Sequence, residues 1–226
     1  EADRTHASKH SRGLASGNIG ILPGFLCAIL LFAAGLIIGL NLKLSFFLIL
    51  IVYFVLSIAY SVYLKKLVLY DVFILASFYT IRVVAGGAVG NIVLSFWLIA
   101  FSIFLFLSLS FIKRYSEFIL TSVNQKHSRR DYSLADITLL QIMGIGTGLL
   151  SVIVFSLYIN SPEVTLLYSN PRALWVICLL LLFWISRIWL VATRGKMTVD
   201  PIVFLLKDLT SYILIILTAV TLLISI

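Results

Sequence analysis

The sequence predicts an all-α, polytopic transmembrane helical bundle. Hydrophobic residues make up 62% of its 226 residues and charged residues only 12%, and the mean hydropathy is +1.13. Soluble domains carry about 25% charged residues. Apolar stretches of about 20 residues, long enough to cross a bilayer as helices, recur along the whole chain. These observations together place nearly all of the chain in a membrane.

Seven spans are predicted, and short polar turns separate them. Asn41–Lys43 and Gly90-Asn91 are expected to form tight helical hairpins, whereas 160–171 forms a longer turn rich in Pro and Asn. Asp200-Pro201 is interpreted as a turn that starts a helix. The predicted spans are Ile21–Leu40, Leu44–Leu64, Val72–Val89, Ile92–Ile112, Ile137–Tyr158, Arg172–Ala192 and Leu209–Ile226.

The distribution of charge predicts the orientation in the membrane. Most of the 17 basic residues lie in 1–20, 65–71, 113–136 and 193–208, whereas the opposite loops hold only Lys43 and Arg172. The positive-inside rule makes the first set cytoplasmic. Every acidic residue except Glu163 lies on the same side, which indicates a polar functional face. The basic residues are spread over short loops, so no nucleic-acid partner is expected.

The first 17 residues form a polar loop that precedes the first span. Glu1 and Asp3 are oxygen ligands two residues apart and are suited to Mg²⁺, which prefers carboxylates together with substrate phosphates. The basic side chains that follow could pair with phosphate oxygens; they are Arg4, His6, Lys9 and Arg12. A solvated basic loop that only sets the topology is the alternative interpretation.

Two cations lie inside predicted spans, where an unpaired charge is costly. Arg82 is expected to face the bundle interior, and either contacts a substrate or forms a structural pair. Arg187 either serves the function or extends toward the interface as an anchor. Near the cytoplasmic face, Tyr60, Lys65 and Asp71 form another candidate group, with interfacial anchoring as the alternative.

The predicted fourth span ends in a charged block, Lys113-Arg114-Tyr115-Ser116-Glu117. On a helix, Lys113 and Glu117 share a face because they are four residues apart. The block is expected to lie on the cytoplasmic side and is interpreted either as a phosphate-binding group or as a surface ion pair.

These blocks, in this order, resemble the UbiA superfamily of membrane prenyltransferases. The resemblance implies a bundle of about nine helices whose first aspartate-rich motif has the form N-D-x-x-D-x-x-x-D-R. Asp3-Arg4 match its last two positions, and Lys9–Gly17 match the basic, glycine-containing stretch that follows. Residues 1–226 are therefore expected to form a UbiA-like domain that lacks its first helix, most of its second, and half of its metal motif. On this interpretation the chain alone is expected to be inactive.

The second motif of the superfamily, D-x-x-x-D, is replaced here by Lys113–Glu117. This departure resembles the decaprenyl-phosphate phosphoribosyltransferase branch, in which 5-phosphoribosyl diphosphate (PRPP) donates phosphoribose to a polyprenyl phosphate. The resemblance implies catalytic roles for Asp3, Lys65, Lys113 and Arg114, with Mg²⁺ as cofactor. It implies substrate contacts from Arg4, His6, Lys9, Arg12, Tyr60, Asp71, Arg82, Tyr115, Glu117 and Arg187. It also resembles a bacterial group in which such a domain follows a phosphatase-like domain. This resemblance implies a location in a bacterial inner membrane and a fused or partner phosphatase-like domain.

Other functions remain open at this point. One is prenyl transfer from a polyprenyl diphosphate to an aromatic or other small acceptor. Both transfers need a polar headgroup site above an apolar groove in the lipid bilayer. A small-molecule transporter is a distant alternative, since it would place ionisable residues through the membrane midplane. A purely structural subunit gives no reason for the clustered acids and bases.

Overall fold

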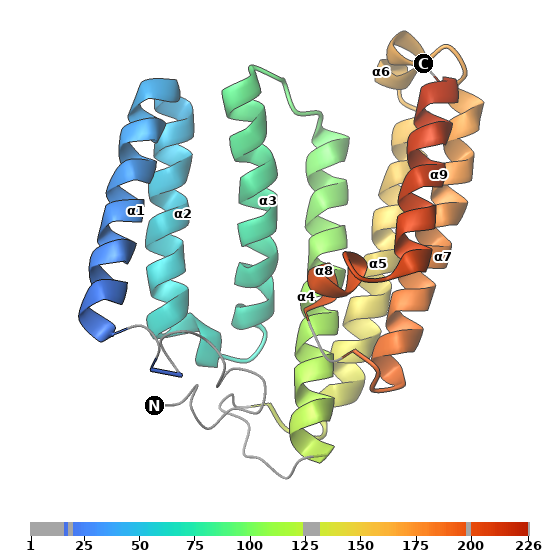
Figure 1. Cartoon of the computed structure of the whole chain (residues 1–226). Helices are drawn as coiled ribbons and strands as arrows, with labels where there is room; N and C mark the ends of the chain where they lie inside the picture. The colour runs from blue at the N-terminus through green and yellow to red at the C-terminus, as the bar shows by residue number, and fades with distance from the viewer. Residues whose placement is uncertain (1–15, 18–19, 124–131, 198–199, 226) are drawn as a thin grey trace. The chain divides into compact units, whose positions relative to one another are not determined.

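The computed structural model describes residues 16–17, 20–123, 132–197 and 200–225. All regular structure in these ranges is helical, as predicted, and Figure 1 shows the order of the helices. They are α1 (Ile21–Leu42), α2 (Leu44–Val62), η1 (Leu64–Lys66), α3 (Tyr70–Gly90), α4 (Phe96–Val123), α5 (Asp136–Ile159), α6 (Pro162–Leu167), η2 (Pro171–Ala173), α7 (Leu174–Thr193), α8 (Pro201–Leu205) and α9 (Leu209–Ser225).

Six of these helices are long and apolar enough to cross a membrane, so the protein is an integral membrane protein. They are α1, α2, α3, α4, α5 and α7, and the short η2 turn is counted as part of the α7 span. The seventh predicted span corresponds to α9, which has 17 residues. At 1.5 Å per residue α9 is about 25 Å long, a little short of the roughly 30 Å hydrocarbon core.

The short turns lie where the sequence predicts them. Lys43 alone, in an extended conformation, separates α1 from α2. Asn91 ends α3 in the left-handed conformation, which asparagine adopts more readily than most residues. Asp200 caps α8 by accepting a hydrogen bond from the Ile202 amide at 3.0 Å, with Pro201 in the first turn. The prediction of a helix start at Asp200-Pro201 is therefore confirmed.

The fourth span differs from its prediction at both ends. Residues 92–95 are not helical, and the Ser95 hydroxyl accepts a hydrogen bond from the Leu98 amide where α4 begins. At the other end, α4 continues through Val123 instead of stopping at Ile112. The predicted span stopped before the charged block because charge ends a hydrophobic run. No proline or glycine interrupts 96–123, so the helix continues after the apolar sequence has ended.

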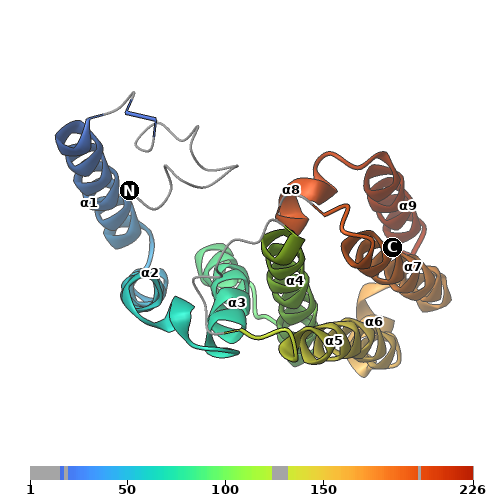
Figure 2. The ribbon, with the colours of Figure 1, turned by 90° about the horizontal axis from the view of Figure 1, so that it is seen from below.

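The chain divides into two compact units, 1–52 and 53–226, and the boundary lies within α2. In the second unit α4 is the central helix, packing against α3, α5, α7 and α8. Figure 2, seen along the helices, shows α4 between α3 on one side and α5 and α7 on the other. The side chains and backbone groups of α4 therefore contact helices that are far apart in the sequence.

Two glycines allow α5 to approach α4 and α7 closely. A Cβ added at Gly144 would lie 2.2 Å from the Trp189 ring, and one at Gly148 would lie 2.7 Å from Ile185. Such a small-xxx-small pair is a common helix contact in membranes. The Ser108 hydroxyl, buried at this contact, donates to the Gly144 carbonyl at 2.7 Å and accepts from the Trp189 indole at 3.1 Å. This packing fixes α4, and with it the charged block in its C-terminal half.

Candidate functional site

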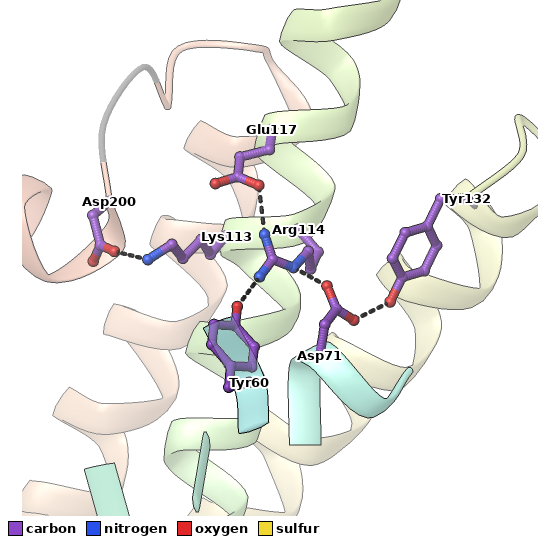
Figure 3. Close-up of polar contacts among 7 residues, drawn as sticks. All are labelled: Tyr60, Asp71, Lys113, Arg114, Glu117, Tyr132 and Asp200. Carbon is purple, nitrogen blue, oxygen red and sulfur yellow. Dashed lines mark hydrogen bonds and ion pairs between the residues drawn. The ribbon is translucent and has the colours of Figure 1, made fainter. Parts of the chain in front are cut away.

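The centre of the candidate site is the buried guanidinium of Arg114 on α4. Only 2% of its side chain is exposed. It pairs through Nε with Asp71, which is fully buried, and through Nη1 with Glu117 at 2.5 Å. Its Nη2 donates to the Tyr60 hydroxyl at 2.8 Å (Figure 3). Arg114 thus joins the end of α2 and the start of α3 to α4.

Tyr132, which lies just before α5, extends this network. Its hydroxyl donates to the second carboxylate oxygen of Asp71 at 2.7 Å and accepts from the Leu69 amide at 2.9 Å. Burial raises the pKa of the Tyr132 hydroxyl, and donation to Asp71 raises it further, so this group stays protonated. Leu69 has a positive φ of 67°, unusual for a residue with a branched side chain. The Tyr132 contact holds this strained turn directly beside Asp71.

Lys113, the neighbour of Arg114, points to a different partner. Its amine lies 2.5 Å from the Asp200 carboxylate, and both side chains remain about one quarter exposed. Next to this pair is a small hollow whose lining includes Tyr79 and Ser110. The Ser110 hydroxyl is buried and has no hydrogen-bond partner among the residues that the structure describes. Of these two groups only the Lys113 amine is exposed enough for an anion to reach.

The two predicted intramembrane cations have different environments. Arg187 forms a two-point ion pair with Asp208, with nitrogen–oxygen distances of 2.6 and 2.8 Å, and thereby ties α7 to the start of α9. Arg82 instead donates to the Tyr53 hydroxyl at 2.6 Å and lies over the rings of Tyr53 and Tyr79. Arg82 is exposed rather than buried in the bundle interior.

The structure brings together only part of the predicted site. It unites Tyr60, Asp71, Arg114 and Glu117 in one network, with Lys113 adjacent on the same helix. Lys113 and Glu117, which were predicted to share a helix face, do not pair with each other. Glu117 pairs with Arg114, and Lys113 pairs with Asp200.

The remaining predicted residues lie elsewhere. Lys65 is exposed in η1, while Tyr115 is buried against Trp189 with ring centroids 5.9 Å apart. Glu1, Asp3, Arg4, His6, Lys9 and Arg12 lie outside the described residues.

Sequence reasoning missed four partners in these networks: Tyr53, Tyr132, Asp200 and Asp208. Each is separated from the residue it contacts by more than 20 positions, so no local spacing reveals the contact. From the sequence, Asp200 was predicted only as the start of a helix. One signal was available: every embedded cation implies a compensating group, and Asp200 and Asp208 are acids on the same face as Lys113 and Arg187.

The fold and the site define the class of the protein. It is a polytopic helical membrane protein with a charged, partly buried site at one set of helix ends. Comparison with known sequences is more specific. The sequence model of the UbiA prenyltransferase family matches residues 1–207. The chain belongs to this family.

Relatives refine this assignment. The uncharacterized protein y4nM of Sinorhizobium fredii is 37% identical over 215 residues, which are 94% of this chain and 42% of that protein. Nodulation protein NoeC of Azorhizobium caulinodans is 30% identical over 220 residues, 94% of this chain and 70% of NoeC. Decaprenyl-phosphate phosphoribosyltransferase of Mycolicibacterium smegmatis is 34% identical over 117 residues, 52% of this chain and 37% of the enzyme. The chain thus spans less than half the length of the first and third relatives.

Enzymes of this family generally use a divalent metal ion. Within the described ranges no group of three or more His, Cys, Asp or Glu side chains converges on one point. The acids around the site are instead engaged by cations: Asp71 and Glu117 by Arg114, and Asp200 by Lys113. These carboxylates do not by themselves fit a divalent ion, and the predicted ligands Glu1 and Asp3 lie outside the described residues.

Proposed function

We propose that this protein transfers the 5-phosphoribosyl group from PRPP to a polyprenyl phosphate. The observation that carries the proposal is the exposed amine of Lys113 on α4. Arg114 beside it is buried and paired with Asp71 and Glu117, so Lys113, about one quarter exposed next to Asp200, is the cation of this group that a phosphate can reach. A lysine amine binds phosphate oxygens directly. The similarity to decaprenyl-phosphate phosphoribosyltransferases over 117 residues supports the same reaction.

The proposed reaction is a substitution at C1 of the ribose. The bond between C1 and the diphosphate oxygen breaks, and an oxygen of the polyprenyl phosphate forms the new bond to C1. The products are the phosphoribosylated lipid and diphosphate. Lys113 would stabilise the negative charge that develops on the departing diphosphate. Lys65, which is exposed, would contact the phosphates of the same substrate.

The nucleophile in this reaction is already an anion and needs no base to remove a proton. This suits the described residues around Lys113, whose acids are all held by cations. Prenyl transfer to a phenolic acceptor would instead benefit from a group that takes up a proton. The phosphoribosyl reaction is therefore favoured over prenyl transfer, which remains the second candidate because it is the reaction that gives the family its name.

Arg114 has a different role in this proposal. Because it is buried and engaged by Asp71, Glu117 and Tyr60, direct contact with a substrate would require those partners to leave. We assign it the role of positioning residue that fixes the helix turn carrying Lys113.

The proposal includes dependence on Mg²⁺, with Glu1 and Asp3 as the predicted ligands. It also includes an orientation with the site on the cytoplasmic side of a bacterial inner membrane, as the positive-inside rule predicts.

The test uses the protein expressed from its complete gene, purified in detergent with Mg²⁺ and radiolabelled polyprenyl phosphate. PRPP is supplied in one reaction, and in another both substrates are replaced by labelled polyprenyl diphosphate plus an aromatic acceptor. A PRPP-dependent phosphoribosylated lipid is expected. Lys113→Gln should lower its rate by about 100-fold or more, the usual loss when one donor to a developing anion is removed. Arg172→Gln, an exposed cation in the η2 turn, is the matched control and should keep the wild-type rate.

Product in the second reaction alone would establish prenyl transfer and reject phosphoribosyl transfer. An unchanged rate in Lys113→Gln would remove Lys113 from the catalytic group even if the reaction itself were found.

A further inference from the structure

Arg82 differs from the candidate cations on α4 and α7. Lys113, Arg114 and Arg187 each contact a carboxylate. Within the described part of the chain, the partners of Arg82 are a tyrosine hydroxyl and two aromatic rings. These contacts orient the guanidinium without neutralising its charge.

The position of Arg82 makes this charge costly. Arg82 lies 12 residues after the start of α3 and eight before its end, about 18 Å and about 12 Å at 1.5 Å per residue. Neither membrane surface is within easy reach of its side chain, and cations at such depths normally pair or line a functional site. An anionic ligand would supply the missing negative charge.

The aromatic surroundings of Arg82 are held in place. Tyr53 packs against Phe78 with ring centroids 5.1 Å apart, and Tyr79 stacks on Phe106 at 5.2 Å. The Arg82 guanidinium carbon lies 5.5 Å and 5.3 Å from the Tyr53 and Tyr79 ring centroids. A guanidinium has five N–H donors, of which one is directed to the Tyr53 hydroxyl. The others remain for two-point binding of a phosphate.

Tyr79 connects this arrangement to the candidate site. It lies beneath Arg82 and also lines the hollow beside Lys113 and Ser110. Two cationic groups, Arg82 and Lys113, therefore flank one tyrosine. Arg82 lies in the interior of its span rather than near an end. Its side chain is exposed on a helix whose other exposed residues are apolar. A ligand that binds there must carry an anion and tolerate hydrocarbon around it.

We propose that Arg82, Tyr53 and Tyr79 form the subsite for the phosphate headgroup of the lipid substrate. This inference rests on the proposed function and adds a division of labour to it. Arg82 binds the phosphate of the incoming lipid, while Lys113 serves the diphosphate of the other substrate. The polyprenyl tail extends from this subsite along the apolar surface of the helices.

The test measures binding and turnover separately. Binding of radiolabelled polyprenyl phosphate to the full protein in nanodiscs is competed with unlabelled polyprenyl phosphate, with polyprenol of the same length, and with inorganic phosphate. Arg82→Gln should weaken lipid-phosphate binding by about 10- to 100-fold, the range expected for one lost charge-assisted phosphate contact. Arg82→Lys, which keeps the charge but loses the fork and the stacking, should give a smaller loss. Arg172→Gln should match wild type.

In the kinetic measurement, Arg82→Gln should raise the KM for polyprenyl phosphate and leave the KM for PRPP unchanged. The reverse pattern would overturn the assignment, as would equal competition by polyprenol, or by inorganic phosphate at the concentration of the lipid. If Arg82→Gln does not fold, Arg82→Lys and the competition on wild-type protein still decide. Phosphate-dependent lipid binding that requires Arg82, without PRPP-dependent product, would reject the proposed reaction and leave the subsite standing.

Discussion

Replacing Asp71 by asparagine removes one carboxylate from Arg114 while keeping a side chain of nearly the same size. The amide oxygen of the new side chain can still accept the hydrogen bond from Tyr132, but its NH2 group then faces the Nε–H of Arg114, so the change removes both the charge and the acceptor for that group. Removing one partner of a buried ion pair costs about 3–5 kcal/mol because the other charge stays buried. Glu117 still compensates Arg114 in this variant, so we expect the lower end, about 3 kcal/mol.

Glu117→Gln provides the comparison within the same network. Its carboxylate also pairs with Arg114, but 38% of its side chain is exposed, against none of Asp71. Exposed pairs contribute only about 0–1 kcal/mol, since water compensates for their loss. The two substitutions remove the same charge from the same guanidinium and differ in burial. Their losses should therefore differ by about 2 kcal/mol or more.

The free energy of unfolding can be measured by titrating the purified protein from mild-detergent micelles into SDS. Tryptophan fluorescence follows the transition, since Trp189 packs close to the network. A loss below about 1 kcal/mol for Asp71→Asn, or equal losses for the two variants, would refute the view that burial makes Arg114 depend on Asp71.

Three further predictions use the same measurement. Gly144→Ala should destabilise by about 1–3 kcal/mol because its methyl would overlap the Trp189 ring, whereas Gly146→Ala on the same helix, with nothing within 4 Å, should be nearly neutral; equal effects would contradict the close contact. Tyr132→Phe should cost about 1–3 kcal/mol because it leaves buried partners of the hydroxyl unsatisfied, and wild-type stability would contradict this. Asp208 has a pKa below its ordinary value: burial raises the pKa, but hydrogen bonds from Arg187 and Ser211 lower it by more. Its ionised form therefore adds stability above the unfolded-state pKa, and this is lost as the pH falls through the folded-state pKa. Asp208→Asn should be less stable than wild type at neutral pH, with the gap closing as the pH falls through the folded-state pKa of Asp208, and a gap that does not change with pH would contradict the assignment.

Local sequence predicted the helices better than their ends. Apolar run length predicted each long helix, and Asn91 and Asp200 marked helix ends because their side chains favour those conformations. The end of α4 was predicted wrongly because hydropathy reports where a helix leaves apolar surroundings, not where it stops being helical. In α4 these points lie about 11 residues apart, and the charged block occupies the helical turns between them.

The candidate site was predictable in residue type more than in pairing. Asp71, Lys113 and Arg114 were identified from the sequence, because charged residues next to spans are few and costly. Their partners were not, and the surface ion pair of Lys113 with Glu117, the alternative interpretation of the charged block, does not form.

The sequence by itself determined that this is a helical membrane protein of the UbiA type, with acids and bases gathered on one face. Composition and run length suffice for the helical membrane class, because the cost of placing polar groups in hydrocarbon acts on each segment separately. The resemblance to the UbiA superfamily came instead from motifs such as Asp3-Arg4 and Lys113–Glu117. Only the tertiary structure decided which charges neutralise one another. It buries Arg114 between Asp71 and Glu117, directs Lys113 to Asp200, and leaves Arg82 with tyrosines alone among its described contacts. Ion pairing depends on distances of a few ångströms between helices, and those distances are set by packing such as the Gly144–Trp189 contact rather than by spacing along the chain.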